Sequence, residues 1–174
     1  MTFLMIIQMT GLSGAGKTTI AGMAKERLSV LGIPLEVIDG DVYRKTLCRD
    51  LGFSREDRCE NIRRLGALAH TFDTPVIISA INPFASARLA LREAYGAKTV
   101  WVDCPLPVLV TRDTKGLYRK ALLPEGHPDK LHNLTGMGDP YEPPLDADLV
   151  IRTDLRLPEE SADELLRFIQ ALLL

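Results

Sequence analysis

Residues 11–19 read GLSGAGKTT and fit the pattern G-x-x-x-x-G-K-[ST] at every fixed position. The apolar run FLMIIQM comes before them, and a helical pattern follows. Glycines allow successive backbone N–H groups to point at one anion, and the first turn of a helix adds a partial positive charge. The stretch therefore predicts a phosphate-binding loop between a buried strand and a helix.

Short apolar runs alternate with longer helical patterns along the rest of the chain. Continuous apolar runs are typical of parallel strands that helices cover on both faces. The alternation predicts an α/β fold: a three-layer, doubly wound, mostly parallel sheet of the P-loop nucleoside-triphosphate hydrolase or kinase type. Strands are expected at 3–9, 35–39, 75–80, 98–103 and 147–153, and helices at 17–31, 54–72, 83–95, 105–112 and 158–172.

The length of 174 residues favours a single domain over 1–174. Residues 122–146 break the alternation, because they hold five prolines and three glycines and show little periodicity. Long loops in compact domains are usually functional or disordered. We expect a mobile lid at about 113–146, and a surface loop without function is the alternative.

The composition is that of an ordinary globular protein, with 46% hydrophobic and 25% charged residues. A formal net charge of -2 indicates no overall attraction to nucleic acid or to an anionic membrane. Three scattered cysteines indicate free thiols in a reducing compartment. The N-terminal apolar run lacks the basic start of a signal peptide, and no run is long enough to span a bilayer. We expect a cytoplasmic protein without nucleic-acid or membrane partners.

Each residue type in the loop has an expected task. Lys17 can reach the β- and γ-phosphates of ATP, and the hydroxyl of Thr18 can bind Mg²⁺. The motif by itself indicates a nucleotide, but it does not separate a hydrolase from a kinase or a switch. The residues expected to bind the nucleotide are Gly11, Ser13, Gly14, Ala15, Gly16, Lys17, Thr18 and Thr19.

Two carboxylates follow the second predicted strand, in VIDGD at 37–41. Ligands of open α/β sheets bind at the carboxyl ends of the strands, so Asp39 and Asp41 are expected beside the phosphates. Phosphoryl transfer to an alcohol needs a general base close to the attacking oxygen, and a carboxylate can also serve the metal. Asp41 also suits the N-cap of a helix that begins with VYRKTL, and the two roles are compatible.

A charged helix is predicted in LGFSREDRCENIRRLG at 51–66, where Ser54 and Asp57 form a typical helix start. Arg58 and Asn61 are three residues apart and share one face of this helix. A guanidinium beside an amide suits an anionic ligand that accepts hydrogen bonds. Taken from the residues alone, a solvent-exposed charged face is the commoner arrangement.

Together, these segments resemble the adenylylsulfate kinases, which use ATP to phosphorylate the 3′-hydroxyl of adenosine 5′-phosphosulfate. The DR-x-EN-I-RR and RD-x-KGLY blocks discriminate more sharply than the phosphate loop. The resemblance implies a kinase that makes 3′-phosphoadenylylsulfate and ADP from ATP and adenylylsulfate, with Mg²⁺. The matching segments occur in family order between residues 11 and 144: GLSGAGKTT, DGD, LGFSREDRCENIRR, INPF, VDCPLPVLVTRDTKGLYRKA and LTGMGDPYEPP.

The resemblance also implies roles for residues at matching positions. Lys17, Asp41 and Asp39 would be catalytic, with Thr18 and Asp41 at the metal and Asp41 beside the acceptor hydroxyl. Phe53 would stack on the base of the acceptor nucleotide. The other substrate-binding residues would be Arg112 at the base of ATP, Lys115 in the lid, and Arg44, Arg58, Asn61, Ile81 and Leu134 around the acceptor.

Three positions depart from the family pattern. A serine that has been proposed as a phosphoenzyme site is here Asn82, which cannot carry phosphate, so direct in-line transfer is favoured. Ala85 replaces an arginine, and Leu134 replaces the second aromatic ring around the acceptor base. Loss of that ring weakens stacking by on the order of 1 kcal/mol. These changes leave the identity of the acceptor open.

Two alternative functions follow. The chain could phosphorylate the 3′-hydroxyl of another activated nucleotide, such as cytidine diphosphoramidate, or it could be a nucleotide-binding regulatory subunit without catalysis. Intact Lys17, Thr18, Asp41, Arg58 and Lys115 argue against the second alternative. The leucine-rich end ELLRFIQALLL predicts a packing face of the last helix, and a homodimer contact is the alternative there.

Overall fold

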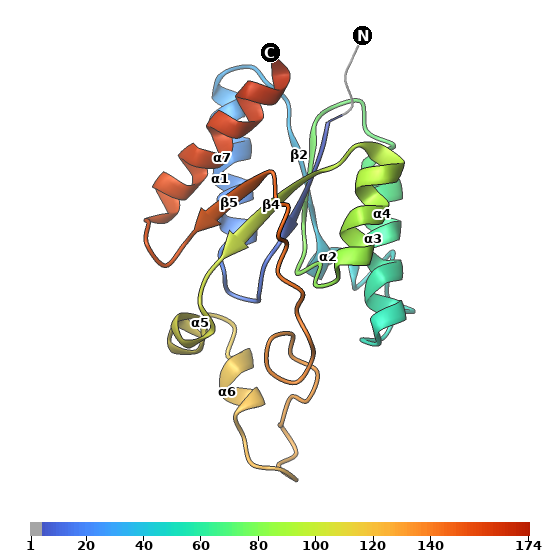
Figure 1. Cartoon of the computed structure of the whole chain (residues 1–174), viewed down its shortest axis with the longest axis vertical. Coiled ribbons are helices and arrows are strands. Elements are labelled where there is room, and N and C mark those ends of the chain that lie inside the picture. Colours follow the sequence, from blue (N-terminus) through green and yellow to red (C-terminus); the bar gives the residue numbers. More distant parts are fainter. Residues whose placement is uncertain (1–4) are drawn as a thin grey trace.

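The computed structural model describes residues 5–174, and five strands in it form one parallel sheet. The strand order is β2-β3-β1-β4-β5, so the strand that precedes the phosphate loop lies at the centre (Figure 1). The strands are β1 (Ile6–Thr10), β2 (Glu36–Asp39), β3 (Val76–Ser79), β4 (Lys98–Asp103) and β5 (Leu149–Arg152). All pairings are parallel, which confirms the predicted sheet.

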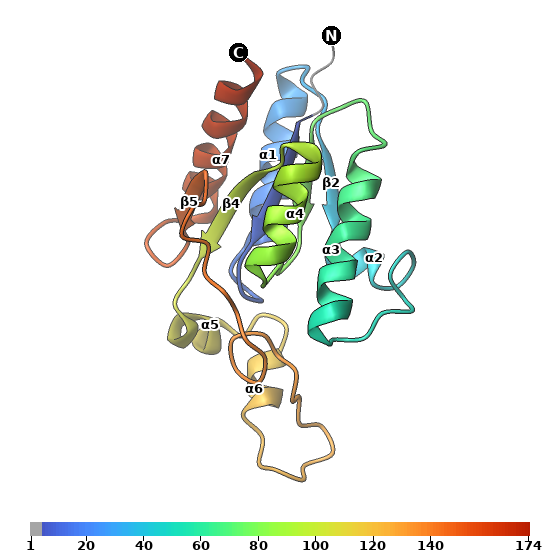
Figure 2. The same cartoon turned by 45° about the vertical axis from the view of Figure 1, so that its right-hand side comes forward.

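Helices cover both faces of the sheet. Helices α1 (Lys17–Val30) and α7 (Pro158–Leu173) lie side by side on one face, and α3 (Arg55–Ala69) and α4 (Ala85–Tyr95) pack together on the other (Figure 2). Side chains alternate across a strand. Ile77 of β3 accordingly joins the core under α1 and α7, while Ile78 joins the core under α3 and α4. The doubly wound, three-layer prediction is confirmed.

Three short helices lie at the end of the molecule toward which the strands run (Figure 1). They are α2 (Gly40–Tyr43), α5 (Leu106–Arg112) and α6 (Leu117–Ala121). The prediction of a helix at 105–112 is confirmed, whereas α6, which lies in the expected lid at about 113–146, was not predicted. A helix of five residues is too short to show a periodic pattern in the sequence.

Most predicted boundaries lie within two or three residues of the observed ones. Residues 3 and 4 of the first predicted strand, and the start of the run weighed as a signal peptide, lie outside the described residues. Ser54 caps α3 by accepting a hydrogen bond from the Asp57 backbone at 3.0 Å, as predicted. The expected N-cap at Asp41 is wrong. Asp39 caps α2 instead, because its Oδ1 accepts the Asp41 N–H at 2.8 Å.

The last helix uses its leucines for packing. Leu165 and Ile169 are completely buried in the core against α1, which confirms the predicted packing face. Pro158 occupies the first turn of α7, and the Glu160 side chain accepts the Leu157 N–H at 2.8 Å. Across residues 5–174, we find no helix with the length and apolar character that crossing a bilayer requires.

The segment 113–146 projects beyond the sheet but is fastened to it at several points (Figure 1). Tyr118 and Leu134 are buried in the core under α1. Near its C-terminal end, the Tyr141 hydroxyl lies 2.9 Å from the Thr10 hydroxyl at the end of β1. The Glu142 N–H donates to the Pro83 carbonyl at 2.9 Å. Structured contacts therefore flank the part of the segment that extends furthest, and its mobility stays a prediction.

Two helical glycines give a matched test of the packing. A Cβ at Gly66 would lie 2.9 Å from Leu91 Cγ between α3 and α4, whereas a Cβ at Gly22 on α1 would meet nothing within 4 Å. We expect Gly66→Ala to lower the free energy of unfolding by about 1–3 kcal/mol through overpacking. Gly22→Ala should raise it by roughly 0.5–1 kcal/mol through reduced backbone entropy of the unfolded chain. Urea denaturation measures both, and changes of the same sign would contradict this account.

Candidate active site

A cavity of about 680 Å³ opens at the carboxyl ends of the strands. It combines the phosphate loop, the end of β2, the residues that follow β3, and parts of the 113–146 segment. The predicted site residues that line it are Ser13, Gly14, Ala15, Gly16, Lys17, Thr18, Thr19, Asp39, Asp41, Phe53, Arg58, Ile81, Arg112, Lys115 and Leu134. Gly11, Arg44 and Asn61 are not in its wall.

The phosphate loop is tightly packed against the sheet. At Gly11, a Cβ would stand 2.3 Å from the backbone oxygen of Val102, which is closer than any side chain permits. Gly16, immediately before α1, has a positive φ of 105°. Two further contacts brace the loop from behind: the Tyr118 hydroxyl donates to the Ser13 carbonyl at 2.7 Å, and the Thr153 hydroxyl donates to the Ala15 carbonyl at 2.8 Å.

Lys17 lies inside the curl of this loop. Its Nζ donates to the carbonyls of Gly11 and Leu12 at 2.8 and 2.9 Å. The residue is only 8% exposed. Burial, with a smaller contribution from the charge of Lys115, lowers the pKa of Lys17 from 10.5 to about 7. An anion bound next to Nζ would favour the charged form of Lys17.

A group of oxygen atoms lies at the start of α1. The Thr18 hydroxyl donates to Asp39 Oδ2 at 3.0 Å and lies 3.2 Å from the Ser79 hydroxyl. Hydroxyl and carboxylate oxygens are the ligands that Mg²⁺ takes when substrate phosphates and waters complete its shell. Residues 5–174 contain no cluster of three His, Cys, Asp or Glu side chains that could hold a metal. The hydroxyl and carboxylate oxygens of Thr18, Ser79 and Asp39 suit a metal whose shell the phosphates of a nucleotide complete.

Ser79 was missed by sequence reasoning. The signal was its place as the last residue of β3, because polar residues at the carboxyl end of a central strand face the site. Asp41 also has a partner that the sequence did not indicate. Its Oδ2 accepts from Lys115 Nζ at 2.6 Å, and both side chains are largely exposed at the cavity mouth. This pair connects the end of β2 to the 113–146 segment.

The opposite wall is built around Phe53, an aromatic side chain that is 55% exposed. The guanidinium groups of Arg44 and Arg58 lie 4.9 and 5.4 Å from the centre of its ring. An exposed ring with two guanidinium groups near it offers an aromatic surface beside cationic donors at the cavity wall. Such a surface suits a base carried on an anionic chain.

Arg58 is buried, with 8% exposure, and its donors hold three partners. Nε donates to the Phe53 carbonyl at 3.0 Å, and Nη2 donates to the Asn133 carbonyl at 2.8 Å and to Asp139 Oδ2 at 2.5 Å. Asn61 on the same helix face is 6% exposed, and its Oδ1 has no hydrogen-bond partner among the described residues. The exposed-face explanation of this helix is therefore wrong for these two residues.

Arg44 lies behind Phe53 and outside the cavity wall. Its Nη1 donates to the Gly52 carbonyl at 2.6 Å. Burial and the charge of Arg58 lower the pKa of Arg44 below its usual value. On the nucleotide side, Arg112 Nη2 donates to the Thr153 carbonyl at 2.7 Å. Thr153, Arg156 and Ser161 also line the cavity, and sequence reasoning missed them because they are more than 130 residues from the phosphate loop.

Of the positions that depart from the family pattern, Asn82 and Phe84 (a tyrosine in that pattern) face the interior, Ala85 is exposed but outside the cavity wall, and Leu134 lies in that wall. Asn82 is 2% exposed with φ 47°, and its Nδ2 donates to Gln8 Oε1 at 3.0 Å. Phe84 is also 2% exposed and lies under the Arg55 guanidinium, 4.1 Å from its ring centre. Neither residue lines the cavity, whereas Leu134 does. The altered positions therefore change the support of the site more than its surface.

The comparisons with known proteins agree with this geometry. The family model for Adenylylsulphate kinase matches residues 4–152. The chain belongs to the adenylylsulfate kinase family. It is 45% identical to the adenylyl-sulfate kinase of Chloroflexus aurantiacus over 97% of this chain and 90% of that protein. It is also 45% identical to the adenylyl-sulfate kinase of Rippkaea orientalis, over 91% and 87%.

A solved structure of the Mycobacterium tuberculosis APS kinase CysC, in complex with AMPPNP and APS, aligns with a TM-score of 0.86. The two chains are 34% identical, and the alignment covers 95% of this chain and 97% of the other. Membership in this family makes the protein a kinase that transfers phosphate to a hydroxyl group. A gluconokinase from Sinorhizobium meliloti, at 21% identity and a TM-score of 0.62, shares the fold alone.

The lowered pKa of Lys17 gives a prediction about proton uptake. Without an anion, Lys17 is mostly neutral above a pH of about 7. Bound phosphates favour the ammonium form, so the pKa rises and nucleotide binding at about pH 8.5 should take up a proton. Titration calorimetry in buffers of different ionisation enthalpy measures this uptake. Lys17→Met should lose it, and an equal uptake in that variant would refute the assignment.

Proposed function

We propose that this chain transfers the γ-phosphate of ATP to the 3′-hydroxyl of adenylylsulfate, giving 3′-phosphoadenylylsulfate and ADP. One observation carries the proposal: a single cavity has the phosphate loop in one wall and the Phe53–Arg58 surface in another. That arrangement suits two nucleotides that meet at one phosphate. The names of the relatives, and the structural neighbour in complex with AMPPNP and APS, support the same reaction.

The loop residues would bind the phosphates of ATP. The backbone N–H groups of the loop and Lys17 would neutralise the charge that develops on the transferred group. Mg²⁺ is proposed as the cofactor, held with the phosphates by Thr18 and by Asp39 or Asp41; when bound, it supplies further charge neutralisation. Arg112 would lie beside the base of ATP, where its bond to the Thr153 carbonyl supports it.

Asp41 is the proposed general base. It lies in the cavity wall between the phosphate loop and Phe53, where an acceptor hydroxyl would enter. Its partner Lys115, at 2.6 Å, would hold the carboxylate at the cavity mouth. Asp39 would hold Asp41 in place through the N–H contact at 2.8 Å. Because Asn82 cannot carry phosphate and is buried, the transfer is proposed to be direct and in line.

The acceptor would lie against the opposite wall. Phe53 would stack on its base and Arg58 would bind its anionic groups, both from the cavity wall. Asn61 and Arg44 lie outside that wall and are proposed to bind its anionic and sugar groups as well. The orphaned Oδ1 of Asn61 supports this role, because a buried amide oxygen without a donor favours a ligand that brings one. The side walls would be formed by Ile81 and Leu134.

We further propose that residues 113–146 act as a lid of the single domain 1–174. The segment contributes Lys115, Asn133 and Leu134 to the cavity wall. Closure over both substrates would exclude water, so that ATP is not simply hydrolysed. A homodimer through the exposed leucines at the end of α7, and a cytoplasmic location, also stay predictions. Sedimentation velocity tests the first of these two.

A second acceptor has one observation in its favour. Leu134 lines the cavity where the family has an aromatic ring, so the chain could accept another activated nucleotide such as cytidine diphosphoramidate. Asn82 and Phe84 give no support to a different acceptor, because both are buried and neither lines the cavity. The non-catalytic alternative has no such support, since Lys17, Asp41 and Lys115 all lie in the cavity wall.

The deciding experiment is coupled ADP release with ATP and Mg²⁺, run in parallel with adenylylsulfate and with a cytidine 5′-diphosphate derivative. We expect fast turnover with adenylylsulfate only. Turnover with the cytidine compound alone would replace the acceptor and keep the reaction type. ATP binding without ADP release for either acceptor would favour a regulatory subunit.

Removal of the Lys17 amine should nearly abolish this activity. We expect Lys17→Ala to lower kcat by at least about 100-fold, since a charge-stabilising donor in a water-excluded site contributes that much. Lys25→Ala is the matched control. Lys25 lies on the same helix, but it is half exposed and pairs only with Glu36. Near-normal activity of Lys17→Ala, or equal losses in both variants, would refute the site assignment.

A further inference from the structure

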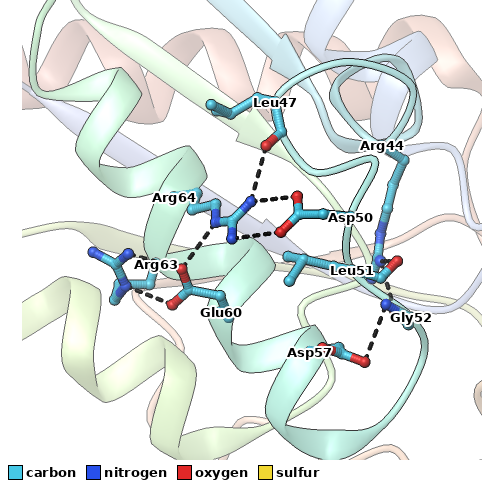
Figure 3. Close-up of polar contacts among 9 residues, drawn as sticks. All are labelled: Arg44, Leu47, Asp50, Leu51, Gly52, Asp57, Glu60, Arg63 and Arg64. Carbon is cyan, nitrogen blue, oxygen red and sulfur yellow. Dashed lines mark hydrogen bonds and ion pairs between the residues drawn. The ribbon is translucent and has the colours of Figure 1, made fainter.

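Residues 44–52 form most of the loop between α2 and α3, and a polar network outside the cavity wall fixes them. Figure 3 shows Arg64 of α3 at the centre of this network, between the loop above it and Glu60 on its own helix. None of the network residues Leu47, Asp50, Glu60, Arg63 and Arg64 lines the cavity. No role has so far been given to them.

The loop determines where two acceptor-site residues lie. Arg44 begins it, and Phe53 follows its last residue, Gly52. Arg44 Nη1 donates to the Gly52 carbonyl at 2.6 Å, and the Gly52 N–H donates to Asp57 Oδ2 at 3.0 Å. The Phe53 ring is more than half exposed, so its direction depends on this backbone and on the two guanidinium groups beside it. A shift of the loop would therefore move the ring.

Arg64 makes four hydrogen bonds with three partners. Nη1 and Nη2 bind the two carboxylate oxygens of Asp50 at 2.6 and 2.8 Å, and Nη1 also donates to the Leu47 carbonyl at 3.0 Å (Figure 3). Nε donates to Glu60 Oε1 at 2.9 Å. Arg64 thus joins two points of the loop to the rigid helix that carries Arg58 and Asn61.

The helix holds Arg64 firmly in this position. Glu60 accepts hydrogen bonds from both Arg63 and Arg64, and these bonds lower the pKa of Glu60 to about 2. The carboxylate is therefore ionised at every ordinary working pH. Among residues 5–174, Arg63 forms hydrogen bonds and ion pairs with Glu60 alone and none with the loop. The two adjacent arginines share an anchor, yet only Arg64 reaches the loop.

The Arg64–Asp50 pair contributes more to the geometry of the loop than to the stability of the protein. Asp50 is 58% exposed, and exposed ion pairs contribute only about 0–1 kcal/mol to stability. A bidentate guanidinium–carboxylate pair nevertheless fixes both the distance and the orientation of its partners. On the far side, the buried Cys48 anchors the loop in the core. The loop is therefore fastened to α3 by Arg64 and by the Asp57 bond to the Gly52 N–H, and to the core by Cys48.

We infer that Arg64 is a positioning residue of the acceptor site, acting through Asp50 and Leu47 on the loop that orients Arg44 and Phe53. This inference rests on the proposed function, because it assigns these two residues to the acceptor. Arg64 touches neither substrate in this account. A misplacement of about 1 Å at a binding site can lower its efficiency up to about 100-fold. The loss of Arg64 should therefore appear in acceptor binding and spare the ATP side.

The kinetic test compares Arg64→Gln and Asp50→Asn with Arg63→Gln as the matched control. We expect the first two variants to raise the KM for adenylylsulfate about 5- to 50-fold, with the KM for ATP and the melting temperature nearly unchanged. Arg63→Gln should leave both KM values unaltered. The double variant Arg64→Gln with Asp50→Asn should lose no more than Arg64→Gln alone, because both changes remove one interaction. The KM of Arg64→Lys for adenylylsulfate should lie between the values of the unaltered chain and of Arg64→Gln, since an ammonium cannot bind bidentately.

A second readout does not depend on the identity of the acceptor. Amide hydrogen exchange of residues 44–53 should accelerate in Arg64→Gln and Asp50→Asn but not in Arg63→Gln, while the phosphate loop stays unchanged. Unaltered exchange in that segment would overturn the inference even if adenylylsulfate proved not to be the substrate. Equal KM changes for ATP and adenylylsulfate, or equal losses in Arg63→Gln and Arg64→Gln, would overturn it as well. If the unaltered chain showed no turnover with adenylylsulfate, that result would instead count against the proposed function.

Discussion

The contact between the phosphate loop and strand β4 is the constraint on which the site depends. Gly11 lies so close to the Val102 carbonyl that no Cβ fits between them. This approach places the loop directly over the carboxyl ends of the central strands, and the Gly11 N–H is satisfied there by the Ile81 carbonyl at 3.1 Å. Lys17 can then turn back into the loop. The position of the anion site is thus set by backbone packing before any ligand is considered.

Arg58 is the corresponding structural constraint in the wall proposed to bind the acceptor. Its three bonds join Phe53, which follows the 44–52 loop, to Asn133 and Asp139 of the 113–146 segment. The cost of burying the guanidinium is offset because its hydrogen-bond donors find partners, one of them a carboxylate. A single side chain consequently relates the ring proposed to stack on a base to the segment proposed to close over it. Lys115 and Asp41 provide a second, more exposed link across the cavity mouth.

A network of buried polar side chains lies beneath the site. Gln8, completely buried in the central strand, donates to the Arg88 carbonyl and to Thr99, and it accepts from Asn82. Arg88 in turn donates to the carbonyls of Asn82 and Glu142. Polar networks of this kind specify one arrangement of the elements they join to the extent that their groups are paired, and Asn82 Oδ1 has no partner among the described residues. Here they connect the strand before the phosphate loop to the end of the 113–146 segment.

Much of the fold was predictable because its signals are local. The strands at 98–103 and 75–80, the helix start at Ser54 and the proline in the first turn of α7 depend on neighbouring residues alone. The short α6 was not predictable, since its five residues make little more than one helical turn and cannot show a repeating pattern. The N-cap at Asp39 was misassigned because two aspartates two residues apart fit the same capping pattern, and only the turn of the backbone chooses between them.

The sequence by itself determined the phosphate loop, the parallel sheet and the family. Those properties follow from residue types at fixed spacing, and such spacing can be read directly from the sequence. The tertiary structure alone decided that Ser79 joins Thr18, that Lys115 pairs with Asp41, and that Arg64 fastens the loop before Phe53. These contacts join positions 14 to 74 residues apart. Their distances depend on how strands and helices pack, and no local pattern in the chain encodes that packing.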